Sequence, residues 1–151
     1  MKSRKASNEK EKILLIGDPS LVKEFSKLCE SRGFSVFLMS RPGVLSTSRD
    51  TRPTRRVQSI PRGISLAIEL TNSDQEQKER NLKAFDKSLP PPVPILSTSI
   101  TVTVAQQAKW IRHGERLIGC SVLPGSLKNR LIEVALSVQT SQGTLSQIRN
   151  F

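Results

Sequence analysis

Short apolar runs and longer amphipathic stretches alternate along most of the chain. The first run, residues 13–16 (ILLI), ends at Gly17 and is followed at once by Asp18-Pro19. A continuous apolar run is typical of a strand buried on both faces, and Asp followed by Pro is typical of a helix start. The chain therefore opens with a predicted strand, a tight turn and a helix that stops at Gly33.

The same alternation continues along the chain. It predicts strands over residues 13–16, 34–39, 64–70, 93–96, 117–122 and 131–138, and helices over residues 18–32, 73–89 and 104–111. Strands that alternate with helices predict a parallel sheet wrapped on both faces. A chain of 151 residues favours a single domain. The predicted fold class is α/β, with a doubly wound, mainly parallel sheet of about six strands.

The two ends of the chain lie outside this pattern. Residues 1–12 are polar and basic, so we expect a flexible N-terminus. The folded domain is expected over residues 13–140. Residues 141–151 are polar and are expected to form a C-terminal tail.

Positive charge dominates the composition, with a formal net charge of +11. It is concentrated in residues 41–62, which hold six arginines, one aspartate and three prolines and are predicted to form a loop. Three interpretations stay open: a solvated basic loop, an anion site for a phosphorylated ligand, and a nucleic-acid patch. The third is disfavoured because no helix-turn-helix, zinc-finger or aromatic-bearing sheet motif is present.

The cysteines and the hydropathy of the chain further limit which classes of protein it can belong to. Cys29 and Cys120 are far apart and have no metal-ligand spacing, which indicates reduced thiols in a cytoplasmic protein and predicts no metal site. No apolar run approaches the roughly 18 residues that a membrane span needs, so no membrane partner is expected.

Four segments in the second half of the chain match a known family in order and spacing. They are LAIEL followed by Lys78, PILSTSITVTVAQQA, ERLIGCSVLP and NRLIEVALSVQTS. Over residues 13–140 the chain resembles the NAD-binding domain of the 3-hydroxyacyl-CoA dehydrogenases, the family that includes 3-hydroxybutyryl-CoA dehydrogenase. The resemblance implies a Rossmann-like fold with NAD at the carboxyl ends of the strands and its pyrophosphate over the first helix.

By this resemblance, seven residues occupy cofactor-binding positions: Gly17, Asp18, Pro19, Ser40, Arg41, Glu69 and Lys78. The family pattern G-x-G-x-x-G reads here as Gly17, Pro19 and Val22. Pro19 adds ring bulk and removes an N–H donor. As a helix cap, Asp18 is expected to accept the N–H bonds that a phosphate would use, and to repel that phosphate. NAD binding is therefore implied by the family and opposed by the turn.

The residues after the second predicted strand differ from those of the family. Its ribose-binding Asp is replaced by Ser40-Arg41. In relatives that bind NADP, an Arg near this point meets the 2′-phosphate. NADP is therefore kept as the less expected cofactor.

The family removes the substrate proton with a histidine that a glutamate orients. The glutamate matches Glu133, but the histidine position matches Ser121, whose hydroxyl is no base near neutral pH without a partner. The substrate-side Asn of the family matches Thr98 or Ser99. The single histidine, His113, lies away from these positions.

Three functions remain open. The first is a catalytically inactive 3-hydroxyacyl-CoA dehydrogenase-like domain that binds a nucleotide, an acyl-CoA or a protein partner, including a second copy of itself. The second is the NAD-binding half of an active NAD-dependent dehydrogenase that needs a separate helical domain. The family carries such a domain after the equivalent of Phe151, so the chain is expected to be a fragment or a free-standing domain. The third is nucleic-acid binding through residues 41–62.

Overall fold

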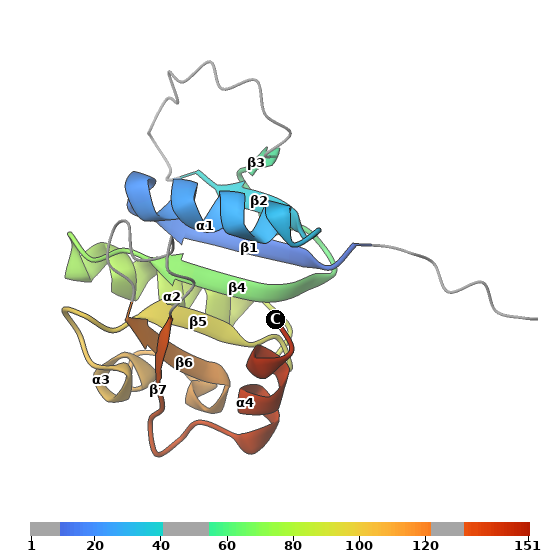
Figure 1. Cartoon of the computed structure of the whole chain (residues 1–151). Helices are drawn as coiled ribbons and strands as arrows, with labels where there is room; N and C mark the ends of the chain where they lie inside the picture. Colours follow the sequence, from blue (N-terminus) through green and yellow to red (C-terminus); the bar gives the residue numbers. More distant parts are fainter. Residues whose placement is uncertain (1–9, 41–54, 122–131) are drawn as a thin grey trace, which may run out of the picture.

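The computed structural model describes residues 10–40, 55–121 and 132–151. In these ranges a seven-stranded sheet is flanked by four α-helices and one 3-10 helix (Figure 1). The elements are β1 (Lys12–Gly17), α1 (Pro19–Ser31), β2 (Ser35–Met39), β3 (Arg55–Val57), β4 (Ile64–Leu70), α2 (Gln75–Ser88), β5 (Ile95–Thr98), α3 (Val104–Ala108), η1 (Gly114–Arg116), β6 (Leu117–Ser121), β7 (Glu133–Ala135) and α4 (Gln142–Arg149).

The strand order in the sheet is β3-β2-β1-β4-β5-β6-β7. All neighbouring pairs are parallel except β6 and β7, which are antiparallel. The chain moves outward from β1 through β2 to β3, then returns to β4 on the other side of β1. This reversal creates a switch point between β1 and β4, which is where ligands bind in open α/β sheets.

Two hydrophobic layers cover the two faces of the sheet. Helices α1 and α4 pack on one face, where Phe25 and Ile148 belong to the same cluster. Helices α2 and α3 pack on the other, through residues such as Phe85 and Val104. Because successive residues of a strand point to opposite faces, the apolar run of β1 contributes to both layers.

The predicted α/β fold with a mainly parallel sheet in a single domain is confirmed, but the predicted loop over residues 41–62 is wrong in part. Arg55–Val57 form β3, which pairs with β2 at the edge of the sheet. Arg55 and Arg56 are exposed, so this edge strand has none of the apolar pattern by which a strand is recognised. The sheet therefore has seven strands rather than about six.

The predicted tail over residues 141–151 is also wrong, because α4 occupies most of it. Ser141 begins the helix by accepting a hydrogen bond from the N–H of Thr144 at 3.0 Å. Leu145 and Ile148 then pack against the layer that contains α1. A helix with so few apolar residues has too weak a periodicity to be recognised from sequence.

Other boundaries shift by a few residues. The fourth predicted strand begins at Ile95 instead of residue 93, the last predicted strand is confined to Glu133–Ala135, and α3 ends at Ala108. Of the predicted flexible N-terminus, residues 1–9 lie outside the described residues, while Lys12 already belongs to β1.

Both cysteines are free thiols buried in the core. Burial raises the pKa of Cys29 to about 11 and that of Cys120 to about 12, so both remain protonated at neutral pH. No helix in the described part of the chain is long and apolar enough to cross a membrane. Within the same ranges no group of three or more His, Cys, Asp or Glu side chains is placed to hold a metal ion.

Candidate functional site

The turn after β1 is held against the neighbouring strand by a glycine. Gly17 has φ of +141°, and a Cβ at this position would lie 2.4 Å from the carbonyl carbon of Leu70 in β4. Only glycine accommodates both the backbone conformation and this close approach. The N–H of Asp18 then donates to the carbonyl of Leu70 at 3.2 Å. The turn thus lies over the switch point between β1 and β4.

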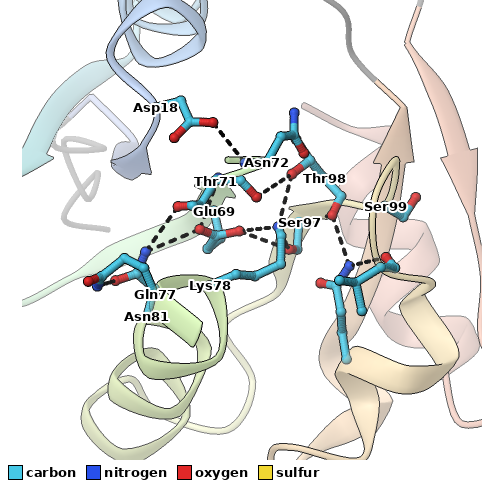
Figure 2. A network of polar contacts seen from close by, with 12 residues as sticks. Asp18, Glu69, Thr71, Asn72, Gln77, Lys78, Asn81, Ser97, Thr98 and Ser99 are labelled. Atoms are coloured by element: carbon cyan, nitrogen blue, oxygen red, sulfur yellow. Dashed lines mark hydrogen bonds and ion pairs between the residues drawn. The ribbon is translucent and has the colours of Figure 1, made fainter. Parts of the chain in front are cut away.

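Asp18 does not cap α1 with its side chain, contrary to the expectation from sequence. Its Oδ2 accepts hydrogen bonds from the backbone N–H groups of Asn72 at 2.8 Å and Ser73 at 3.1 Å, and its Oδ1 accepts from the Ser73 hydroxyl at 2.7 Å. The carboxylate therefore holds the loop after β4 instead of the first N–H groups of α1 (Figure 2). The reason is geometric: the N–H groups of that loop are oriented toward the β1 turn.

The N-terminus of α1 therefore has no side-chain cap. Pro19 stands at its first position and has no N–H, so the first donor available to an anion belongs to Ser20. Val22, at the family's third glycine position, is half-buried and packs against the cluster beneath α1. The helix–strand contact thus accommodates a branched side chain where the family has glycine.

A buried ion pair lies at the carboxyl ends of β4 and β5. The Nζ of Lys78, on α2, contacts Oε2 of Glu69, and the two side chains are 1% and 0% exposed. The same ammonium lies 3.1 Å from the Ser97 hydroxyl, and 3.0 Å and 2.9 Å from the carbonyl and hydroxyl oxygens of Thr98. Figure 2 shows Lys78 extending beneath Ser97 and Thr98.

The Glu69 carboxylate is as fully hydrogen-bonded as its partner. It accepts from the N–H of Thr71 at 3.0 Å, the amide of Asn81 at 3.1 Å and the hydroxyl of Ser97 at 3.2 Å. A buried ion pair is tolerated when its remaining donors and acceptors are satisfied in this way. Glu69 and Lys78 therefore connect α2 to the sheet from a position beneath the molecular surface.

The positions that match the family's histidine and glutamate are paired in the sheet. Ser121 ends β6, Glu133 begins β7, and the two face each other directly in the antiparallel ladder. Directly opposed residues of such a ladder have Cβ atoms about 5 Å apart on the same face of the sheet. Glu133 is exposed and Ser121 is half-buried. The twelve-residue spacing in the sequence thus becomes a cross-strand neighbour pair.

Comparisons with known proteins agree with this architecture. No family model matches the sequence, and no curated protein matches it either. Among solved structures, 3-hydroxybutyryl-CoA dehydrogenase from Escherichia coli aligns over 93% of this chain and 35% of its own, with a TM-score of 0.76 and 16% identity. The (S)-3-hydroxybutyryl-CoA dehydrogenase PaaH1 from Ralstonia eutropha aligns over 94% and 59%, with a TM-score of 0.78 and 16% identity. The chain therefore has a 3-hydroxyacyl-CoA dehydrogenase-like fold.

The same fold extends to a different dehydrogenase. Prephenate dehydrogenase from A. aeolicus, in complex with hydroxyphenyl propionate and NAD+, aligns over 95% of this chain and 57% of its own, with a TM-score of 0.69 and 14% identity. The chain thus spans between about one third and three fifths of the length of these three structures. At these identities the likeness establishes the fold alone, and the chemistry has to be argued from this chain's own residues.

The two candidate substrate residues, Thr98 and Ser99, differ in burial and in their contacts. Thr98 is 0% exposed, and its carbonyl oxygen also accepts from Nε2 of Gln107 at 2.8 Å. Ser99 is half-buried, and its N–H donates to the carbonyl of Cys120 at 2.8 Å. The Ser99 hydroxyl lies where a Cβ at Gly119 would project, 3.0 Å away. Gly119 and Ser121 share a face of β6, so Ser99 lies on the Ser121 face of the sheet.

Ser40 and Arg41 follow β2, at the same edge of the sheet. The N–H of Ser40 donates to the carbonyl of Val57 in β3 at 3.1 Å, so Ser40 lies where β2 and β3 end. Arg41 lies outside the described residues. Sequence reasoning placed arginines near this point but did not recognise that Arg55 and Arg56 belong to the adjoining strand.

His113 is at the opposite edge of the sheet, before the first residue of β6. Its Nδ1 lies 3.1 Å from Oδ1 of Asp86, which also accepts from the guanidinium of Arg116 at 2.8 Å. Burial acts to raise the pKa of Asp86, but the hydrogen bonds from Arg116, the Arg112 N–H and His113 outweigh it and hold that pKa below its ordinary value. This cluster fixes the end of α2 and is remote from Ser121.

Sequence reasoning missed the polar partners of the ion pair. Thr71, Asn81, Ser97 and Gln107 are all buried and all hydrogen-bonded to this cluster or to its backbone. The available signal was the appearance of polar residues at the ends of otherwise apolar strands, as in ILST. That signal identifies buried polar positions but not which of them contact one another.

Proposed function

We propose that this chain is a nucleotide-binding domain with the dehydrogenase frame and without the general base of the 3-hydroxyacyl-CoA dehydrogenases. The observation that carries the proposal is the cross-strand pairing of Ser121 with Glu133. By the family resemblance Glu133 corresponds to the orienting glutamate, and the residue paired with it is a serine. The sequence has a single histidine, His113, which precedes β6 at the opposite edge of the sheet from Ser121 and contacts Asp86 through its ring.

The serine does not replace the histidine in this role. Proton abstraction from a hydroxyl near neutral pH needs a group that titrates near 7, and a serine hydroxyl does not. Glu133 is exposed and lies beside the Ser121 hydroxyl. Its carboxylate can accept a hydrogen bond from that hydroxyl but cannot make it a base that titrates near neutral pH. Hydride transfer by the family's route therefore lacks its proton acceptor in this chain.

The cofactor edge supports binding of a dinucleotide more strongly than the sequence suggested. The Asp18 carboxylate is bound to the loop after β4 and does not cap the N-terminus of α1. The N–H groups of Ser20 and Leu21 and the positive end of the helix would hold the pyrophosphate. Pro19 withholds one donor, and the nearby negative charge of Asp18 opposes the phosphate. We expect binding that is weaker than in a glycine-rich turn.

NADP is a second candidate because of β3. Arg55 and Arg56 are exposed on the strand beside β2, next to the position where the adenosine ribose lies in this fold. A 2′-phosphate would lie near the positive charges of these arginines, and Ser40 would not repel it as the family's aspartate would.

Substrate-side contacts would come from Ser99, since Thr98 is buried. The free thiols of Cys29 and Cys120 fit the cytoplasmic location expected from the sequence.

Calorimetric titration of NADH, NADPH and acetyl-CoA into the purified chain tests the proposal. One-to-one binding of a dinucleotide is expected, and it should tighten several-fold in Pro19→Gly, which restores an N–H donor. A matched control is Pro91→Gly, which lies away from the turn. Binding by neither dinucleotide would overturn the nucleotide assignment and leave an acyl-CoA, a protein partner or a second copy of the chain as the ligand. Oxidation of NADH by acetoacetyl-CoA at rates well above background would overturn the missing-base argument.

A further inference from the structure

A cavity lies on the sheet face that carries α1 and α4, away from the turn after β1. Figure 1 shows these two helices separated along the sheet, with β4 between them. The pocket there has a volume of about 220 Å³ and is partly open to solvent. An engineered apolar cavity of about 150 Å³ is large enough to bind benzene. The space is therefore large enough for a small organic molecule.

The walls of this cavity are apolar. Of the thirteen described residues that line it, twelve are hydrophobic, Cys29 included. The floor is formed by adjacent strands, with Ile13 1%, Leu66 3% and Ile68 2% exposed. Phe34 and Phe151 close one side, with ring centroids 5.6 Å apart.

Among the residues that the structure describes, a single charged side chain lines the pocket. Arg32 follows the last turn of α1 and is exposed. Its backbone N–H bonds to α1, but its guanidinium makes no hydrogen bond or ion pair with any residue that the structure describes. A guanidinium presents a planar pair of N–H donors that matches a carboxylate. An apolar pocket with one such group at its wall fits a molecule that has an apolar body and one acidic end.

We propose that this pocket binds a small monocarboxylate whose apolar body is somewhat larger than a benzene ring. The body packs on Leu66 and Ile68, beneath Phe25 and Phe151, and the carboxylate pairs with Arg32. The site is separate from the nucleotide site, because Leu66 and Ile13 are near the amino ends of β4 and β1, whereas the dinucleotide turn follows their carboxyl ends. Two ligands of different chemistry can therefore occupy the domain at once.

Octanoate and octan-1-ol serve as probes, because they share an apolar chain and differ in charge. Each is titrated by calorimetry, and amide chemical shifts in ¹H–¹⁵N spectra locate the site. We expect one-to-one binding of octanoate with shifts centred on Cys29, Ile148 and Phe151. Saturation with NADH should leave the octanoate shifts in place. Absence of octanoate binding, or shifts centred on Gly17 and Asp18 instead, would overturn the proposal.

Two variants and one control sharpen the test. Arg32→Gln should weaken octanoate by about two- to five-fold, the range of an exposed ion pair, and leave octan-1-ol unchanged. Lys27→Gln removes the same charge from an exposed position of α1 that does not line the pocket, and should change neither. Cys29→Met fills the pocket and should weaken both probes. Equal effects of Arg32→Gln and Lys27→Gln on octanoate would show that only net charge matters and would contradict the assignment.

Discussion

Two polar groups lie along the same carboxyl edge of the sheet and differ in burial. Glu69 and Lys78 are inaccessible and satisfied on every side by neighbouring donors and acceptors. Ser121, the last residue of β6, is half-buried, and Glu133, the first residue of β7, is exposed. The first group is part of what holds α2 to the sheet, whereas the second contributes little to packing.

This difference shows which of the two groups the fold depends on. A change at Lys78 would leave a carboxylate buried without its counter-charge, which costs several kcal/mol. A different side chain at position 121 would extend toward solvent and leave the hydrogen bonds between β6 and β7 intact. The fold therefore constrains the buried pair strongly and the exposed pair weakly, so Ser121 can be replaced without loss of the fold.

The largest effect should follow from breaking the buried pair. We expect Lys78→Met to lower the free energy of unfolding by about 3–5 kcal/mol, because Glu69 is left buried and uncompensated. Adding Glu69→Gln should recover part of that loss. The control Lys83→Met removes an exposed ion pair with Glu79 and should cost less than about 0.5 kcal/mol. Urea denaturation of the three variants measures these differences, and similar values for Lys78→Met and Lys83→Met would contradict the account.

The turn over the switch point should be nearly as sensitive. Gly17→Ala places a Cβ 2.4 Å from the Leu70 backbone at φ of +141°, and we expect a loss of about 2–4 kcal/mol. Gly33→Ala is the matched control: its φ is +90° but nothing lies within 4 Å of the added Cβ, so only the strain of about 1 kcal/mol should appear. Equal losses in thermal unfolding would mean that the contact with Leu70 does not constrain the turn.

The Asp86 cluster should give the fold an acid-sensitive component. The pKa of Asp86 lies below its ordinary value of 3.8, so its stabilisation is present above that value and is lost as the pH falls through the lower, folded-state pKa. Asp86→Asn should cost about 2 kcal/mol at pH 7 and show a smaller loss of stability between about pH 4 and pH 2. Denaturation midpoints across this range measure both effects. A variant that loses stability in acid as steeply as the native chain would contradict this assignment.

The smallest effect is expected at the exposed pair. Ser121→Ala and Glu133→Gln should each change the free energy of unfolding by less than about 0.5 kcal/mol, because neither side chain carries buried packing. A loss of 2 kcal/mol or more in either variant would mean that the pair is structural, and the contrast between the two polar groups would fail.

Much of the fold could be predicted because its elements carry strong local patterns. The apolar runs of β1 and β4 and the Asp-Pro and Gly signals around α1 placed these elements to within a residue or two. The edge strand β3 and the helix α4 were missed, since an exposed Arg-Arg-Val strand and a short helix have too few apolar residues to show a period.

The site was less predictable because contacts depend on side-chain direction. The resemblance matched Ser121 and Glu133 to the family's histidine and glutamate, and it did not predict that the two residues would pair across β6 and β7. It did not reveal that Asp18 would bind the loop at Asn72 and Ser73, fifty-four and fifty-five residues away. An Asp before a helix usually caps that helix, and only the tertiary position of the β4 loop decides otherwise.

The most direct test of the proposed function introduces an imidazole in place of Ser121 and measures its titration by NMR. In Ser121→His the new imidazole would face Glu133, and we expect its pKa to rise by roughly one unit above the ordinary value near 6.5. In Ser121→His with Glu133→Gln that rise should disappear. An imidazole that titrates near 6.5 whether or not Glu133 is present would contradict the claim that this edge keeps the geometry of the dehydrogenase pair and lacks only its base.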